Sequence, residues 1–162
     1  MNCSRRVVLI GRTICFPMLI ENLSVWNVRG LNSRARRNVV GELVRQEHAS
    51  LISLQETKLD VCDDVLIREM LGPMFDFFYL PACHTCGGIL LAWKRDTWTA
   101  SSPNCRNFSL TAKVTHISSG EEWSITSVYG PQADQDKLVF WMSCAQLGRL
   151  FLRNGSYVVT SI

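Results

Sequence analysis

Two side chains that offer oxygen atoms stand at matching places in the sequence, each at the end of an apolar segment. Asn27 ends the segment LSVWN, and Glu56 follows the segment LISLQ. Successive side chains of a strand point to opposite faces, so Asn27 continues the row of Val25 and Glu56 continues the row of Leu54. Because burying a lone carboxylate is costly, Glu56 should turn to solvent, find a partner or bind a cation.

A hard cation is the chemistry that fits this pair. Mg²⁺ takes oxygen ligands, accepts few of them from protein and keeps waters that a substrate phosphate can displace. Asn27 and Glu56 are therefore candidate magnesium ligands. The alternative interpretation is that both are ordinary polar residues that meet solvent where their strands stop.

A cluster of basic residues, Arg34, Arg36 and Arg37, lies between these two segments. The three residues fall in the first turn of a predicted helix, where the helix dipole disfavours cations. A nucleic-acid phosphate would relieve that cost, so the cluster is a candidate nucleic-acid-binding surface. A solvated helix start is the alternative.

Two further segments carry groups that can take part in chemistry. Tyr129 lies at the end of a predicted strand, in the segment SVYGP. Its hydroxyl either projects into a crevice built by loops or lies buried with an ordinary hydrogen bond. The segment CHTC, residues 83–86, has the spacing of half a zinc site or of a redox pair. No second ligand pair follows at suitable spacing, and we assign this segment no role.

The segments that carry Asn27 and Glu56 are predicted to be neighbouring parallel strands. Between them, LNSRARRNVVGELVRQEHAS has apolar residues at helical spacing, with Asn32 or Ser33 as the N-cap. A strand, a helix and a second strand form a crossover unit whose strands run parallel. Their carboxyl ends open onto one edge of the sheet, so Asn27 and Glu56 should face one crevice.

The rest of the pattern predicts one more helix and several strands before a final helix. LDVCDDVLIREMLG is expected to be a helix with Val61 and Val65 among its apolar positions. Strands are expected in FDFFYLPA, GGILLAWK and EWSITSVYG, with a less regular region over 109–116 and a helix over 136–150. This order indicates an α+β fold or a layered sandwich rather than a doubly wound sheet.

The composition is that of one globular domain. The chain has 162 residues, 47% of them hydrophobic, and a net charge of +3, which permits an anionic partner without requiring one. Seven cysteines without the spacing of a small secreted framework favour a reducing compartment. We expect an intracellular location, nuclear if the chain acts on DNA, with no membrane association and no small-molecule cofactor.

Residues 1–19 are interpreted as an N-terminal extension, because the regular pattern begins near residue 20. Arg12 and Pro17 interrupt the first apolar run, and no clear small-residue cleavage site follows, which argues against a signal peptide. No segment reaches the roughly 18 uninterrupted apolar residues that a membrane span needs.

Four motifs in register carry a resemblance to a known family. WNVRGLN, LISLQETKLD, GGILLAW and VYGP, in this order and at these distances, resemble the endonuclease/exonuclease/phosphatase superfamily. Within it, they are most similar to the endonuclease domain of plant LINE-type (non-LTR) retrotransposon proteins. The resemblance covers about residues 20–160 and implies a partial four-layered α/β sandwich of the DNase I-like type. Residues 20–162 would then form an incomplete domain of this kind.

The resemblance also implies roles by position. The family cleaves phosphodiester bonds with a metal ion, and the retrotransposon branch acts on DNA, so magnesium and DNA are the implied cofactor and partner. Asn27 and Glu56 match the family's metal-site residues, and Tyr129 matches the tyrosine near the scissile phosphate. Glu56 and Tyr129 are thus the catalytic candidates. Phosphatase or lipid substrates, used elsewhere in the superfamily, fit these motifs less well.

The chain departs from the family's pattern near residue 160. The family continues with a Gly-Asp-x-Asn motif and ends with a Ser-Asp-His motif, which help to activate water and hold the phosphate. Ser161 and Ile162 stand where the Gly and Asp of the first motif are expected, although Asp134 or Asp136 could supply a carboxylate. Losing a general base costs about 10² to 10⁴ in rate. We expect a C-terminally truncated endonuclease domain of retrotransposon origin with little or no activity.

Two other interpretations stay open. The chain could be a non-catalytic fragment that binds nucleic acid or a protein partner through the arginine cluster. It could also be a translated relic that folds poorly, because a sandwich without its later strands exposes a core face and a sheet edge. The sequence does not specify the target sequence, the choice between DNA and RNA, or the oligomeric state.

Overall fold

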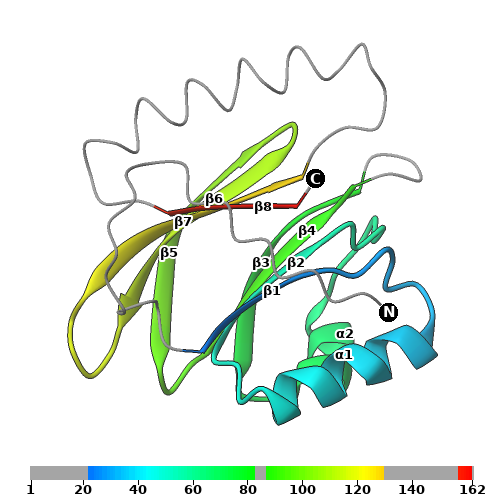
Figure 1. Ribbon diagram of the computed structural model, residues 1–162, viewed down its shortest axis with the longest axis horizontal. Coiled ribbons are helices and arrows are strands. Elements are labelled where there is room, and N and C mark those ends of the chain that lie inside the picture. The colour runs from blue at the N-terminus through cyan, green and yellow to red at the C-terminus, as the bar shows by residue number, and fades with distance from the viewer. Residues whose placement is uncertain (1–21, 83–86, 130–156, 162) are drawn as a thin grey trace.

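A computed structural model describes residues 22–82, 87–129 and 157–161 of the chain. In that part, two helices and two four-stranded sheets form three layers (Figure 1). The helices cover one face of the first sheet, and the second sheet packs on the other face, so the fold is an α+β sandwich, as the sequence predicted. The extension at 1–19 and the predicted helix over 136–150 lie outside the described residues. No helix of the described part is long and apolar enough to cross a membrane.

The first sheet contains the predicted crossover. β1 (Leu23–Asn27) and β2 (Leu51–Gln55) are hydrogen-bonded parallel neighbours, and α1 (Arg34–Gln46) connects them along the chain. Asn27 lies opposite Gln55 in the register. The carboxyl ends of the two strands are therefore side by side at one edge of the sheet.

Two antiparallel strands complete this sheet in the order β1-β2-β4-β3. β3 (Phe75–Leu80) pairs with β4 (Ile89–Lys94), which in turn pairs with β2. The central strand β2 is buried at every position. Ile52 and Leu54 pack in the cluster under the helices, whereas Leu51 belongs to the core between the two sheets.

The second sheet has the order β5-β6-β7-β8. Its strands are β5 (Trp98–Arg106), β6 (Ser109–His116), β7 (Glu122–Tyr129) and β8 (Tyr157–Ser161). All neighbours are antiparallel except β7 and β8, which run parallel. The hydroxyls of Ser53 in β2 and Ser127 in β7 form a hydrogen bond between the two sheets.

Two strands of the second sheet correct the sequence-based expectation. The region over 109–116, predicted to be less regular, is the continuous strand β6, and β5 was not predicted at all. β5 is an edge strand, largely exposed, with a register shift between Ser101 and Asn104. Such a strand needs no alternating apolar row and tolerates the proline in TASSPNCR, so the usual strand pattern is missing.

Side-chain caps begin both helices. The hydroxyl of Ser33 accepts a hydrogen bond from the Arg36 N–H at 3.3 Å, and the carboxylate of Asp63 accepts one from the Leu66 N–H at 2.8 Å. Each cap satisfies a backbone donor that the first helical turn leaves without an intrahelical partner. Ser33 is thus the N-cap, one of the two residues that the sequence offered.

The second helix, α2 (Asp64–Leu71), buries a narrower face than predicted. Ile67 and Met70 pack against the first sheet, but Val61 and Val65 are 68% and 65% exposed. The assignment of these two valines to the apolar face was wrong because α2 begins only at Asp64. Val61 therefore precedes the helix, and Val65 lies on the outer side of its first turn.

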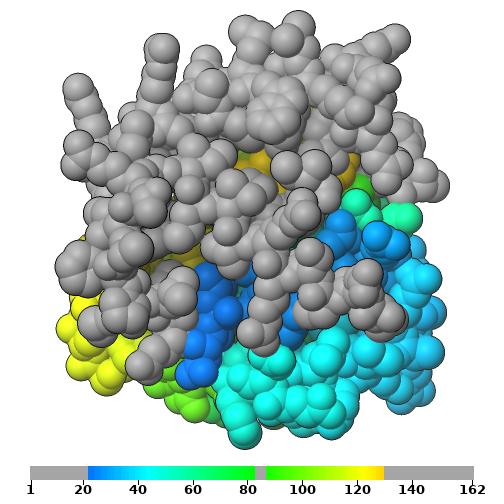
Figure 2. Space-filling model, viewed as in Figure 1, coloured from blue at the N-terminus to red at the C-terminus, as the bar shows by residue number. Residues whose placement is uncertain are grey.

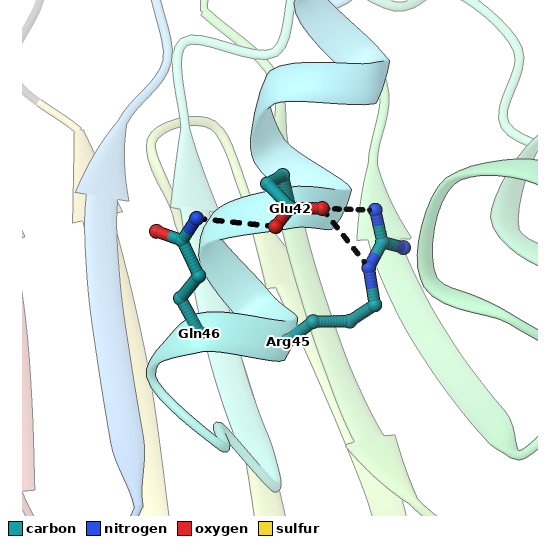
Figure 3. Close-up of polar contacts among 3 residues, drawn as sticks. All are labelled: Glu42, Arg45 and Gln46. Atoms are coloured by element: carbon teal, nitrogen blue, oxygen red, sulfur yellow. Dashed lines mark hydrogen bonds and ion pairs between the residues drawn. The ribbon is translucent and has the colours of Figure 1, made fainter.

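The outer face of α1 carries a small polar cluster. The Glu42 carboxylate accepts hydrogen bonds from Arg45 Nη2 at 2.8 Å and Gln46 Nε2 at 3.1 Å (Figure 3). The hydrogen bond from Arg45, with that from Gln46 and the charge of the guanidinium, lowers the pKa of Glu42 below its ordinary value of 4.5. Figure 2 shows part of α1, drawn in cyan, on the surface of the molecule.

Candidate functional site

The structure places Asn27 and Glu56 at the same edge of the first sheet. Asn27 is the last residue of β1 and lies beside Gln55, which directly precedes Glu56. The loops that follow the two strands are tied together, because the Leu31 N–H donates a hydrogen bond of 2.7 Å to the Thr57 carbonyl. Ligands of open α/β sheets bind beyond the carboxyl ends of parallel strands, so this edge is the candidate functional site.

Glu56 does not continue the row of Leu54, contrary to the simple alternation. β2 ends at Gln55, and Glu56 adopts a φ of +55°, in the left-handed region that residues other than glycine rarely enter. The turn takes the Glu56 side chain out of the buried strand and leaves it half-buried. The carboxylate therefore avoids the cost of full burial, and Glu56 directly follows Gln55, the neighbour of Asn27 in β1.

Backbone strain gathers at this edge. Six residues other than glycine have a positive φ in the described part of the chain, and Arg29, Glu56 and Lys58 are three of them. Each lies in a loop that follows β1 or β2. Such conformations cost about 1–3 kcal/mol and persist only where surrounding contacts hold them, which is common at functional sites.

The side chain of Asn27 is oriented by its own loop. Its Oδ1 accepts a hydrogen bond of 3.2 Å from the Arg29 N–H, two residues further on. An amide oxygen has two lone pairs, so in general it can accept a hydrogen bond and bind a cation at the same time. The amide oxygen of Asn27 and the carboxylate of Glu56 are both hard oxygen donors, and they fit an ion such as Mg²⁺ that keeps most of its own waters. The described residues contain no group of three or more His, Cys, Asp or Glu side chains that could hold a metal ion.

Tyr129 reaches this edge from the second sheet. It is the last residue of β7, it is 9% exposed, and the hydroxyl end of its ring lies on the backbone of Gly87. The carbonyl of Gly87 accepts a hydrogen bond of 2.9 Å from the Lys58 N–H, two residues after Glu56. One glycine thus separates the tyrosine ring from the loop that carries Glu56, as expected if the tyrosine belongs to the site.

Two of the three predicted basic residues interact with the loop after β1. Arg36 Nη1 donates to the Arg29 carbonyl at 2.5 Å, and Arg37 Nη1 donates to the Leu31 carbonyl at 2.9 Å. These bonds offset the unfavourable position of cations at a helix N-terminus. Arg34 is exposed. The cluster borders the candidate site, because the Arg36 guanidinium and the Lys58 side chain approach the same glycine, Gly30.

Other reactive groups of the described part lie away from this edge or belong to the packing. Cys62 is 6% exposed, and burial raises the pKa of its thiol to about 12, so the thiol stays protonated. His116 packs edge-on against Trp98, with ring centroids 4.7 Å apart. Asp134 and Asp136, considered as additional carboxylates, and the CHTC segment lie outside the described residues.

A separate cavity of about 300 Å³ lies at the opposite end of the first sheet. Its lining includes Val44 in α1, His48 after α1, Phe75 at the start of β3 and Lys94 at the end of β4. This is the end at which β2 begins, since the Lys94 N–H donates to the Ser50 carbonyl. The cavity is therefore not part of the candidate site.

From the sequence alone, Gly87 and Gly88 were not identified as residues of the candidate site. The signal was present in the motif GGILLAW, where two consecutive glycines precede a strand. Both have a positive φ, at +78° and +86°, and both lie against the loop after β2. Their contribution depends on contacts between segments far apart in sequence, which a local pattern does not report.

Comparison with known proteins identifies the fold. No family model and no curated protein matches the chain. Among solved structures, an endonuclease/exonuclease/phosphatase family protein from Bacteroides thetaiotaomicron matches with a TM-score of 0.63 and 9% identity, covering 85% of this chain and 62% of that one. The human Nocturnin catalytic domain with bound sulfate anion matches with a TM-score of 0.64 and 12% identity, covering 84% and 62%.

A third similar structure is that of D. rerio TDP2 complexed with a single-strand DNA product. It has a TM-score of 0.57 and 13% identity, and the match covers 84% of this chain and 57% of that one. At these identities the likenesses establish the fold, which is the one adopted by proteins of the endonuclease/exonuclease/phosphatase family. The chain spans less than two thirds of the length of each of these structures.

Proposed function

We propose that the chain is a phosphodiesterase domain of the metal-dependent DNA endonuclease type, derived from a LINE-type retrotransposon. The observation that supports this proposal is that neighbouring segments at one edge of the sandwich carry Asn27, Glu56 and Tyr129. Support for DNA as the ligand comes from the structural neighbour that contains a DNA product. The retrotransposon origin rests on the resemblance of four motifs alone.

Each side chain of the proposed site would have a role that fits its chemistry. Asn27 Oδ1 and the Glu56 carboxylate would hold Mg²⁺. When bound, this ion supplies positive charge that polarises phosphoryl oxygens. The Tyr129 hydroxyl can donate a hydrogen bond to a phosphate oxygen near the scissile bond. Arg34, next to the loop after β1, would contact a backbone phosphate without base specificity.

We further propose that the chain has little or no nuclease activity. β8 runs parallel to β7 with Ser161 in register with Tyr129, so this strand ends at the same edge. In the sequence, Ile162 stands where the resemblance expects the aspartate of the family's Gly-Asp-x-Asn motif. An isoleucine cannot accept a proton or orient water, and a missing general base lowers the rate by about 10² to 10⁴.

A supercoiled-plasmid nicking assay tests the level of activity. We compare the parent with Glu56→Gln, which removes the charge at the site, and with Glu69→Gln, which removes an exposed charge on α2, each with and without Mg²⁺. The expected result is that magnesium-dependent nicking by the parent and by Glu69→Gln does not exceed that by Glu56→Gln. Rapid nicking that only Glu56→Gln abolishes would contradict the proposal of little or no activity and point to a complete site.

A non-catalytic nucleic-acid-binding module is the second candidate function. The observation in its favour is the basic border of the site, where Arg34 is exposed and Arg36 lies near Lys58. This function requires no metal ion. It predicts DNA binding that is unchanged in Glu56→Gln and weaker in variants of the arginine cluster.

A further inference from the structure

Gly87 and Gly88 lie where three segments of the sandwich meet. Their carbonyls accept hydrogen bonds from the backbone of the loop after β2, Gly87 from the Lys58 N–H at 2.9 Å and Gly88 from the Thr57 N–H at 3.1 Å. β4 begins directly after them, and the ring of Tyr129 from β7 rests on Gly87. The pair therefore connects the end of the first sheet with the end of the second.

The hydroxyl end of the Tyr129 ring fills the space beside Gly87. A Cβ added at Gly87 would stand 2.5 Å from Cε1 and from Cζ of that ring and 2.6 Å from its hydroxyl oxygen, closer than real Cβ atoms come. The ring is 9% exposed, and the ring of Phe108 lies on it with centroids 6.1 Å apart. The Tyr129 N–H is also held by the Phe108 carbonyl at 3.0 Å. A side chain at position 87 would therefore have to displace the hydroxyl.

Gly88 makes a similarly close contact with the loop that carries Glu56. A Cβ there would overlap the hydroxyl of Thr57 and come within 3.3 Å of the Lys58 nitrogen. Thr57 is 2% exposed, so its side chain lies in the close-packed interior. The absence of a side chain at position 88 is what allows this loop to approach the start of β4.

We propose that Gly87 and Gly88 are positioning residues, which set the distance between the Tyr129 hydroxyl and the Glu56 loop. This inference deepens the proposed function, because it assigns Tyr129 its place beside the proposed metal site. A glycine at both positions lets the tyrosine ring and the loop pack on opposite sides of one short stretch of backbone. A side chain at position 87 moves the hydroxyl and leaves the positions of Asn27 and Glu56 unchanged.

The chain offers a matched control for this proposal. Gly87 and Gly120 have similar φ values, +78° and +70°, so alanine introduces the same kind of backbone strain at either position. A Cβ at Gly120 meets nothing within 4 Å. Any effect of Gly87→Ala beyond that of Gly120→Ala therefore reports the contact with Tyr129.

The test uses the full chain labelled with 3-fluorotyrosine and observed by ¹⁹F NMR. The chain has three tyrosines, and Tyr129→Phe identifies the signal of Tyr129. In metal-free protein, Gly87→Ala should shift that signal, whereas Gly120→Ala should not. With Mn²⁺ added, the signal should broaden in the parent, and Gly87→Ala should reduce the broadening without changing the affinity for Mn²⁺. An unchanged Tyr129 signal in Gly87→Ala would overturn the proposal.

A second variant covers the case in which Gly87→Ala fails to fold. Replacing the ring in Tyr129→Ala removes the overlap, so Gly87→Ala in that background should fold and cost no more stability than Gly120→Ala does. A double variant that still fails to fold would contradict the proposed contact. If the parent does not bind Mn²⁺, the proposed function fails, and the shift in metal-free protein alone decides the positioning role.

Discussion

At the scale of single residues, the candidate site combines a predictable part with a part that only the structure reveals. The neighbourhood of Asn27 and Glu56 follows from the sequence, because the crossover between them requires parallel strands with adjacent ends. The orientation of Glu56 does not follow from it. The side-chain alternation holds only while the backbone stays extended, and the φ of +55° at Glu56 ends it.

The thiol of Cys62 gives a prediction on reactivity. Burial raises its pKa to about 12, and a protonated thiol is a poor nucleophile. We expect that Cys62 stays unmodified when the folded protein is treated with iodoacetamide at pH 8, and that it reacts after denaturation. Peptide mapping by mass spectrometry measures both. Rapid modification of Cys62 in folded protein would show that this part of the core is open.

The carboxylate of Glu42 gives a prediction on pH. Its pKa is lowered mainly by the hydrogen bond from Arg45, so its ionised form stabilises the fold above the ordinary value of 4.5. This stabilisation is lost as the pH falls through the lowered pKa in the folded state. Urea denaturation should show that Glu42→Gln is less stable than the parent at pH 7 and that the difference shrinks below pH 4.5. A difference that grows on acidification would contradict this assignment.

At the scale of elements, the sequence predicted most of the strands and helices that bury one face, although it described the half-buried strand β6 as less regular. β4 was expected from ILLAWK, which is buried almost throughout. β5 was missed because most of its residues are exposed at a sheet edge. The burial of Val61 and Val65 was wrongly predicted because capping by Asp63, rather than the apolar pattern, determines where α2 begins.

The contact between α1 and α2 gives a prediction on stability. A Cβ at Gly41 would overlap the backbone carbonyl oxygen of Met70 in α2, so alanine forces the two helices apart. Although alanine favours helices, overpacking costs about 1–3 kcal/mol, and we expect Gly41→Ala to lower the free energy of unfolding by that amount. The exposed Asn38→Ala in the same helix serves as the control and should be neutral or stabilising. Urea denaturation that shows no loss in Gly41→Ala would contradict the close approach.

At the scale of the whole molecule, two sheets bring the site together from distant parts of the sequence. Asn27 and Glu56 come from the first sheet, and Tyr129 comes from the second. Sequence motifs predicted that these residues share a site. They could not predict how, because the contact runs through Gly87, and no local pattern links a glycine to a tyrosine 42 positions later.

If the exposed Arg34 beside the candidate site contacts a DNA phosphate, its removal should change how DNA binding depends on salt. Each phosphate contact contributes about 0.9 to the slope of log K against log salt for duplex DNA, so removing one should reduce the slope by about 1. We expect that Arg34→Gln reduces the slope in a fluorescence-anisotropy titration, whereas Arg68→Gln, an exposed arginine on α2, does not. Equal slopes for the two variants would exclude Arg34 from the DNA contact.

The equilibrium binding of Mn²⁺, measured by electron paramagnetic resonance of the free ion, tests the proposed cation site. We expect saturable binding to the parent and to Glu69→Gln, and its loss in Glu56→Gln and in Asn27→Ala. Such a result would establish that the adjacent ends of β1 and β2 form a cation site. Binding of equal strength in all four proteins, or no binding to the folded parent, would contradict the central claim.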